Sequence, residues 1–255
     1  MSSRKRTVTA AFSAAASRYD SDAEAQIRAA GLLVERLPVL SAAPQVLELG
    51  CGTGVLTRLL LERLPPGARQ LASDLSPAMV EQAKSGLCDP RLDFAVMDAE
   101  APGLPPAAFD LIVSSLAAQW FEDLPRTIDR LVGLLRPGGT LLLGSLGSGT
   151  FAQWRAAHAE LGLEAGVAAY PTAPELAALH PGMVVESVPF TIAYGDARAF
   201  LRALQTIGAT TPKPGHRPLS PGSLRRIMTR LGAPCVITWD ILILSARPAL
   251  EGQKQ

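Results

Sequence analysis

Three alternating glycines and a later acid form the stretch of this sequence whose spacing points most directly to binding chemistry. Gly50, Gly52 and Gly54 stand in VLELGCGTG, directly after an apolar run, and Asp74 lies 20 residues beyond Gly54. Glycine permits a tight turn and lets a ligand approach the backbone. An acid at that distance is placed to bind ribose hydroxyls in a mononucleotide-binding unit. The simpler interpretation is a plain tight turn, with Asp74 as a helix cap.

The glycine loop does not match two common nucleotide-binding loops. Val55 occupies the position where the dinucleotide fingerprint G-x-G-x-x-G needs its last glycine, and the loop lacks the Gly-Lys-Ser/Thr ending of a P-loop. The pattern that the sequence does carry is acid-x-G-x-G-x-G, beginning at Glu48. It resembles motif one of the Rossmann-like S-adenosylmethionine-dependent methyltransferases, and the resemblance continues over residues 46–147.

The resemblance implies a role for each acid in this half of the chain. Asp74 would hold the ribose diol, Asp98 would bind the adenine amino group, and the backbone N–H of Ala99 would meet a ring nitrogen. Glu48 and the loop backbone would hold the methionine end of S-adenosylmethionine. The further cofactor contacts expected are Gly50, Cys51, Gly52, Gly54, Leu75, Met79, Ser114 and Ser115. Because a sulfonium ligand has no phosphate, the loop needs no lysine.

Three segments outside the glycine loop resemble one family of these methyltransferases. They are AAFSAAASRYD near the N-terminus, SSLAAQWFEDL after residue 113, and FLRALQTIGAT from residue 200. In this order they resemble the malonyl-acyl-carrier-protein O-methyltransferases of biotin synthesis, with Ser115 where that family usually has Asn. Residues 150–182 match least. The resemblance implies methyl transfer to the free carboxylate of a malonyl thioester, which makes an ester primer for pimeloyl synthesis.

The acceptor implied by this resemblance needs orientation more than acid–base catalysis. A malonyl carboxylate is already ionised at pH 7, as carboxylic acids with pKa values of about 4 are. Alignment with the methyl–sulfur bond and exclusion of water would then carry the reaction. Arg202, inside the otherwise apolar AFLRALQTIG, is predicted to grip the carboxylate with its planar fork. The alternative is a surface arginine on the polar side of a helix.

Three more residues are expected to line the acceptor side of the site. Tyr19 would close the pocket from an N-terminal helix and offer a hydroxyl. Gln119 and Trp120 follow the fourth predicted strand, at the edge where ligands lie in such sheets. Trp120 could equally belong to the core, and Ser114 and Ser115 could be plain strand-end residues.

Residues 196–230 are strongly basic, although the whole chain has a formal net charge of only +1. Asp196 is the one acid of this segment. Its cations are Arg198, Arg202, Lys213, Arg217, Arg225, Arg226 and Arg230. Such a concentration suits an acidic partner, and the resemblance implies an acyl carrier protein. A solvated face on two helices is the alternative, and a nucleic-acid partner is not expected because interleaved aromatic residues are missing.

An alternation of strands and helices is predicted to position these residues. Strands are expected at 45–49, 69–74, 92–98, 109–116 and 136–146, with helices at 55–64, 76–87 and 124–135. Such alternation predicts a parallel sheet covered on both faces. The expected fold is therefore α/β: a Rossmann-like, mostly parallel seven-stranded sheet, with N-terminal helices and helical insertions covering the active site.

A single domain, residues 1–255, is expected to comprise four parts. They are an N-terminal helical cap at 9–38, a cofactor-binding core at 44–147, helical insertions and a lid around one strand at 148–233, and a final strand at 234–248. Residues 1–8 are predicted to be a frayed basic tail. The S-x-x-E pattern from Ser21 to Glu24 predicts a capping box at the start of a fresh helix that ends near Pro38.

Composition narrows the class of protein further. A chain of 255 residues that is 48% hydrophobic can bury a sizeable core. No apolar run reaches about 18 residues, so neither a membrane span nor a membrane partner is expected. Three cysteines without a C-x-x-C pair and three histidines without ligand-spaced neighbours indicate a cytoplasmic protein without a metal site.

Two other functions are compatible with the same residues. One is methylation of a free small-molecule carboxylic acid or of another metabolite. The other is a non-catalytic S-adenosylmethionine-binding protein, against which Glu48, Asp74, Asp98 and Arg202 argue together.

Overall fold

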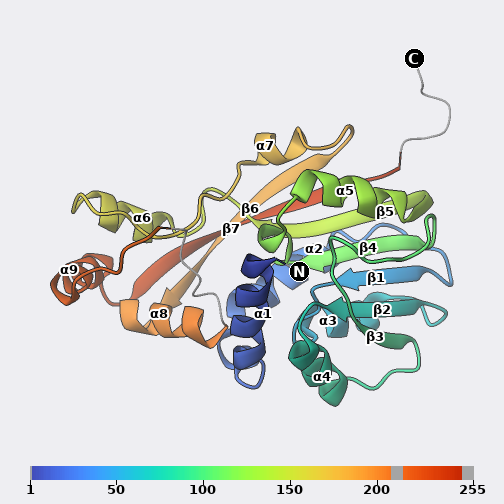
Figure 1. Ribbon diagram of the computed structural model, residues 1–255, viewed down its shortest axis with the longest axis horizontal. Coiled ribbons are helices and arrows are strands. Elements are labelled where there is room, and N and C mark those ends of the chain that lie inside the picture. Colours follow the sequence, from blue (N-terminus) through green and yellow to red (C-terminus); the bar gives the residue numbers. More distant parts are fainter. Residues whose placement is uncertain (1, 208–214, 249–255) are drawn as a thin grey trace.

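One seven-stranded sheet runs through the protein (Figure 1). The computed structural model describes residues 2–207 and 215–248. The strand order across the sheet is β3 (Leu92–Val96), β2 (Arg69–Asp74), β1 (Gln45–Leu49), β4 (Phe109–Ser115), β5 (Leu135–Leu146), β7 (Cys235–Ala246) and β6 (Val184–Tyr194). β1 to β5 pair in parallel, whereas β7 runs antiparallel to both β5 and β6. The predicted α/β fold with a mostly parallel sheet is confirmed.

Helices precede, connect and follow the strands. They are α1 (Ser3–Ala15), the 3-10 helix η1 (Tyr19–Asp22), α2 (Glu24–Val34), α3 (Val55–Arg63), α4 (Pro77–Gly86), the 3-10 helix η2 (Ala118–Trp120), α5 (Leu124–Gly133), α6 (Ala152–Ala159), α7 (Ala173–Ala177), α8 (Ala197–Thr206) and α9 (Pro221–Leu231). Local chemistry explains several starts. At α4, Pro77 is the first residue and the Ser76 hydroxyl accepts a hydrogen bond from the Met79 N–H at 3.2 Å.

The two faces of the sheet bury different helices. Val46 of β1 belongs to a core that includes Leu33 of α2 and Leu56 of α3. Its neighbour Leu47 belongs to a second core, with Ile128 of α5. Successive side chains of a strand point to opposite faces, so the continuous apolar run of β1 supplies both layers.

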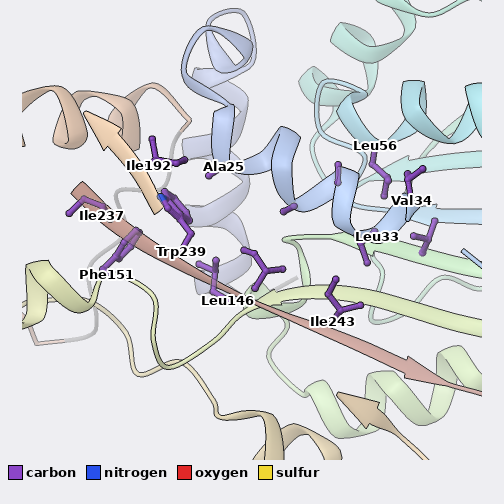
Figure 2. Close-up of a cluster of buried hydrophobic side chains, with 14 of the residues drawn as sticks. Ala25, Leu33, Val34, Leu56, Leu146, Phe151, Ile192, Ile237, Trp239 and Ile243 are labelled. Atoms are coloured by element: carbon purple, nitrogen blue, oxygen red, sulfur yellow. The ribbon is translucent and has the colours of Figure 1, made fainter. Parts of the chain in front are cut away.

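The core under α2 and α3 extends to the far end of the molecule. Figure 2 shows it running from Leu33 and Leu56 to Phe151 and Trp239. The Phe151 and Trp239 rings meet edge to face, with centroids 4.9 Å apart. Figure 1 shows α6, α8 and α9 gathered around this end of β6 and β7. The late helices therefore share a core with the parallel strands.

The N-terminus differs from the sequence prediction. The predicted frayed tail is wrong, because α1 begins at Ser3 and the Ser2 hydroxyl accepts a hydrogen bond from the Lys5 N–H at 3.1 Å. The predicted capping box is also wrong. The Ser21 hydroxyl donates to the Arg18 carbonyl, and α2 begins at Glu24 without a side-chain cap. A 3-10 turn over Tyr19–Asp22 occupies the place of that cap.

Of the helices in residues 2–207 and 215–248, none combines the length and apolar character that crossing a bilayer requires.

Candidate active site

A cavity lies at the carboxyl ends of the parallel strands and is lined in part by residues of α1. This is the edge where open α/β sheets bind their ligands. The predicted site residues that line it are Tyr19, Gly50, Gly52, Asp74, Leu75, Met79, Asp98, Ala99, Ser115 and Trp120. The structure thus brings together residues from four strand ends and from the N-terminal helical segment.

Two glycines of the loop form one wall of the cavity in different ways. Gly50 has a φ of 67°, and a Cβ there would lie 2.6 Å from the Cβ of Ala117. Gly52 has a φ of 55°, and a Cβ there would meet nothing within 4 Å. The loop therefore presses against the segment after β4 at Gly50 and leaves open space at Gly52. Gly54 lies outside the cavity, at the N-cap of α3.

Backbone amides fix the carboxylate of Asp74, the last residue of β2. One oxygen accepts from the Gly52 N–H at 3.0 Å and the other from the Ser76 N–H at 2.8 Å. Burial raises the pKa of Asp74 above its ordinary value, and these hydrogen bonds oppose the rise. Each carboxylate oxygen keeps a further lone pair, so Asp74 can still accept hydrogen bonds from a ligand.

A second pair of acids lies where the chain leaves β3. Asp98 and Glu100 both line the cavity, and the Lys5 ammonium bridges them at 2.7 Å from each. Burial alone would raise the pKa of Glu100. Hydrogen bonds from Lys5 and from the Asp123 and Glu122 amides outweigh it and lower that pKa. Both acids thus stand ready to accept hydrogen bonds at one end of the cavity.

Aromatic side chains also line the cavity. Trp120 lines it, and Phe12 of α1 meets the Trp120 ring edge to face at a centroid distance of 5.5 Å. Tyr19 packs beside Phe12 at 6.5 Å. Burial and the charges of Asp74 and Asp20 raise the pKa of Tyr19, so it is a neutral hydroxyl at pH 7. These three rings give the cavity a partly apolar lining.

Glu48 does not line the cavity, although it was expected to hold the methionine end of the cofactor. It is fully buried on β1, and its carboxylate accepts a hydrogen bond from the Gln70 side chain at 2.8 Å. Burial raises the pKa of Glu48 to about 7, against hydrogen bonding by Thr57 and Gln70. Glu48 therefore supports the sheet beneath the glycine loop and carries only part of a charge at pH 7.

Three other predicted site residues also lie outside the cavity lining. Ser114 is buried and its hydroxyl donates to the Leu49 carbonyl at 2.7 Å. Gln119 donates to the Leu116 carbonyl at 2.7 Å. Cys51 is buried, and burial raises the pKa of its thiol, so it is not activated. These residues brace the loop and the strand ends that carry the lining residues.

Arg202 lies on the exposed side of α8, outside the cavity. There it borders a groove between α8 and α9, which we call the basic groove. The groove is lined by Arg198, Leu201, Arg202, Gln205, Pro221, Leu224, Arg225 and Met228. The structure therefore groups Arg202 with other arginines of the basic segment, and Arg202 is not among the residues that line the cavity. Lys213 and the 208–210 end of the matched FLRALQTIGAT segment lie outside the described residues.

Several lining residues escaped prediction from the sequence. Lys5, Val8, Thr9 and Phe12 of α1 all line the cavity, and their spacing of three, four and seven is that of one helix face. This helical spacing is the signal in the sequence from which these four lining residues could have been predicted. Leu116 also lines the cavity, with a φ of 53°. Such strain in a residue other than glycine gathers at functional sites, but it is invisible in a sequence.

Comparisons with known proteins agree on the class. Residues 47–143 match the family model described as a methyltransferase domain. Among solved structures, the YcgJ protein of Bacillus subtilis superposes with a TM-score of 0.60 at 16% identity, over 86% of this chain and 97% of that one. A putative methyltransferase of Bacillus halodurans gives a TM-score of 0.60 at 14% identity, over 86% and 98%. The fold is that of a Rossmann-like methyltransferase domain.

Curated relatives resolve the family within that class. The chain is 35% identical over 93% of its length to a malonyl-[acyl-carrier protein] O-methyltransferase of Pseudescherichia vulneris, and covers 95% of that protein. Identity to the protein of that name from Magnetococcus marinus is 38%, over 82% of this chain and 80% of the relative. This chain belongs to the malonyl-[acyl-carrier protein] O-methyltransferase family.

A longer relative shows how the domain is used elsewhere. The biotin biosynthesis bifunctional protein BioCD of Bordetella avium is 43% identical over 88% of this chain. The chain spans about half of that relative, 48% of its length. The match therefore concerns one of its two parts.

The lining residues suit S-adenosylmethionine. A Cβ at Gly50 would overlap Ala117, so only glycine leaves the loop this close to the strand end. The carboxylates of Asp74 and Asp98 stand at separate positions along the cavity, where hydroxyl and amino groups of a nucleoside can donate to them. The hydrogen-bond acceptors of the cavity are thus matched to the donor groups of a nucleoside.

Proposed function

We propose that this protein transfers the methyl group of S-adenosylmethionine to the free carboxylate of a malonyl thioester carried by an acyl carrier protein. The observation that carries the proposal is the match over almost the whole length of relatives with that name, at 93% of this chain and 95% of one relative. The product is a malonyl methyl ester, which masks the charge and suits the primer role in pimeloyl and biotin synthesis.

The cofactor's part is to supply an electrophilic methyl group on a sulfonium. We propose that the residues of the chain hold it as the family resemblance implies. Asp74 accepts from the ribose diol and Asp98 from the adenine amino group, while the N–H of Ala99 meets a ring nitrogen. The backbone at Gly50 and Gly52 lies against the methionine end. The fixed carboxylate of Asp74 supports this assignment, since it needs no reorganisation on binding.

The acceptor carboxylate needs no base, because it is ionised at pH 7. We propose that Tyr19 and Ser115 offer hydroxyl donors to the acceptor and that Trp120 excludes water from it. All three line the cavity near the glycine loop. Asp20, next to Tyr19, accepts a hydrogen bond from Thr53 of that loop at 2.5 Å. This bond supports a fixed distance between Tyr19 and the loop, as alignment of the reacting atoms requires.

We propose that Arg202 acts in carrier docking rather than as a clamp on the malonyl carboxylate. The arginines of the basic groove are exposed, and its floor contains Leu201, Leu224 and Met228. An acidic carrier that presents carboxylates around apolar side chains complements such a surface. On this view the chain acts as one unit, in which 148–233 bring the carrier to a cavity formed by the N-terminal cap and the 44–147 core.

The decisive experiment is a substrate panel. Isolated protein receives labelled S-adenosylmethionine with malonyl-carrier protein, malonyl-coenzyme A, free malonate, and the succinyl and glutaryl thioesters. We expect methylation of malonyl thioesters, fastest on the carrier. Equal labelling of free malonate would favour the free-acid methyltransferase. Tight cofactor binding with no labelled product in any arm would favour the non-catalytic binding protein.

A further inference from the structure

Helix α1 covers the cofactor cavity. Lys5, Val8, Thr9 and Phe12 form the face that lines it. Figure 1 shows α1 lying across the ends of the parallel strands. A ligand held at Asp74 and Asp98 is therefore enclosed between the sheet edge and this helix.

Lys5, in the first turn of α1, makes polar contacts with two acids of the cavity. The Lys5 ammonium lies 2.8 and 2.7 Å from the two carboxylate oxygens of Asp98 and 2.7 Å from Glu100. The three side chains are mostly buried, with exposed fractions of 12% for Lys5, 29% for Asp98 and 11% for Glu100. Burial would lower the pKa of Lys5, but the two acids outweigh it and raise that pKa.

The sequence of α1 makes its first turn dependent on those acids. The turn contains Arg4, Lys5 and Arg6 and no acid of its own. Cations near a helix N-terminus are disfavoured by the helix dipole. Asp98 and Glu100 supply from across the cavity the negative charge that the turn lacks.

The other end of α1 is attached differently. The Ser13 and Ser76 hydroxyls lie 2.7 Å apart, which ties the helix to the start of α4. Phe12 packs on Trp120. These uncharged contacts hold the C-terminal half of α1, whereas the ion pairs of Lys5 and a hydrogen bond from the N-cap Ser2 hydroxyl to the Glu122 carboxylate hold the N-terminal half over the cavity.

We propose that Lys5 is a positioning residue of the cofactor site: its ion pairs with Asp98 and Glu100 latch α1 over the cavity and orient Asp98. A carboxylate offers about four lone-pair sites, and Asp98 uses three of them for two contacts with Lys5 and one with the Glu100 N–H. One site is left to accept from a ligand amino group while Lys5 stays bound. The latch thus stays closed with the nucleoside in place and slows its escape. This inference rests on the cofactor site and is independent of the acceptor.

The test uses the full-length protein and S-adenosylhomocysteine as the probe. Three variants are compared with the wild type: Lys5→Met, which keeps the apolar stem, Lys5→Arg, which keeps the charge, and Arg4→Met, which removes an exposed cation from the same turn. The readouts are hydrogen exchange of the 3–15 amides and the dissociation rate of the probe in stopped flow. Neither readout requires turnover, so the result is valid even if the protein does not methylate a malonyl thioester.

We expect Lys5→Met to speed both α1 exchange and probe dissociation about tenfold, the equivalent of one charge-assisted hydrogen bond. Lys5→Arg should recover most of the effect, and Arg4→Met should change neither rate. Raising salt should change dissociation from the wild type little, because a mostly buried ion pair is screened much less than an exposed one. Unchanged rates in Lys5→Met, or equal effects of Arg4→Met, would overturn the latch. So would faster α1 exchange without faster probe dissociation.

Discussion

The cofactor cavity and the basic groove place charge in opposite ways. In the cavity, Asp74 is held by two backbone amides and Asp98 by Lys5, so each carboxylate has one position. In the groove, Arg198, Arg202 and Arg225 are exposed on two helices. The first arrangement is rigid and recognises one small molecule. The second is suited to attracting a larger partner that arrives from solution.

The difference shows why residues of the same type contribute unequally. A buried group that loses its partner keeps the full cost of desolvation, whereas an exposed charge exchanges its partner for water and salt. Changes in the cavity should therefore alter stability or cofactor affinity strongly. Changes in the groove should alter carrier recognition weakly and depend on ionic strength.

Gly50→Ala should have the largest effect. The new Cβ would meet Ala117 at 2.6 Å in a backbone conformation with φ of 67°. Left-handed strain of about 1–2 kcal/mol and overpacking of about 1–3 kcal/mol together predict a loss of roughly 2–5 kcal/mol in the free energy of unfolding. Urea denaturation measures it.

Gly52→Ala is the matched control for Gly50→Ala, because its Cβ would meet no protein atom within 4 Å. It should cost only about 1–2 kcal/mol of strain. Adding Ala117→Gly to Gly50→Ala should bring that variant to the same value. If the two single variants lose the same free energy of unfolding, close packing against Ala117 does not explain why residue 50 is glycine.

Glu48 should make stability fall as pH rises. Its folded pKa, about 7, lies above the ordinary value of 4.5, so the folded state binds the extra proton. That stabilisation is complete below pH 4.5 and is lost as pH rises to about 7, by about 3 kcal/mol at 1.36 kcal/mol per unit. Denaturation of the wild type and Glu48→Gln across this range tests it. Equal pH slopes for the two proteins would mean that Glu48 titrates normally.

Asp74→Ala should weaken S-adenosylmethionine binding by about 1.5–3 kcal/mol, the range for hydrogen bonds to a charged group. The variant also frees the Gly52 and Ser76 amides, so the loop loses its fixed position. Isothermal titration calorimetry gives the affinity, and Arg225→Ala serves as a control outside the cavity. Wild-type affinity in the Asp74 variant would show that another acid binds the ribose.

Substitutions in and beside the basic groove should have the smallest effects. Reversing Arg225 and Arg226 to Glu should raise the apparent KM for malonyl-carrier protein roughly 2- to 30-fold, at about 0.2–1 kcal/mol for each exposed pair. A short malonyl thioester should be affected little, and added salt should reproduce the change. Equal loss on both substrates would point to damage to the fold.

Arg202→Ala sharpens the same contrast. If Arg202 is a docking residue, the Arg202→Ala variant should raise only the apparent KM for malonyl-carrier protein, by a few-fold. As a carboxylate clamp it would lower kcat/KM on both substrates by roughly 30- to 4,000-fold. Steady-state kinetics on the two substrates separate these roles.

Much of the parallel half could be predicted because its cues are local. The strand predicted at 69–74 coincides with β2, and Ser76 and Pro77 begin α4 as expected. The glycine loop follows β1 directly, so Gly50, Gly52 and Asp74 were placed at one edge by the parallel order alone. The expected roles of these residues remain predictions until binding is measured.

The N-terminal and late segments could not be predicted as well, since their positions depend on distant partners. From the sequence, Lys5 is predicted to be part of a basic tail. The fold places it beside Asp98, which is 93 residues away in the chain. Arg202 sits in an apolar stretch that suggested a site, yet its helix turns Phe200 inward and leaves the arginine exposed. Periodicity indicates which face of a helix is buried, but it does not predict which element covers that face.

Strand–helix alternation, glycine spacing and the three matched segments were enough to predict the class of fold, the binding edge and the family, because they are properties of neighbouring residues. Tertiary structure alone decided that α1 covers the cavity, that Glu48 is buried beneath the loop, and that the arginines form a groove between α8 and α9. Those outcomes depend on burial and on contacts between residues far apart in the chain, where desolvation selects the partner of each charge.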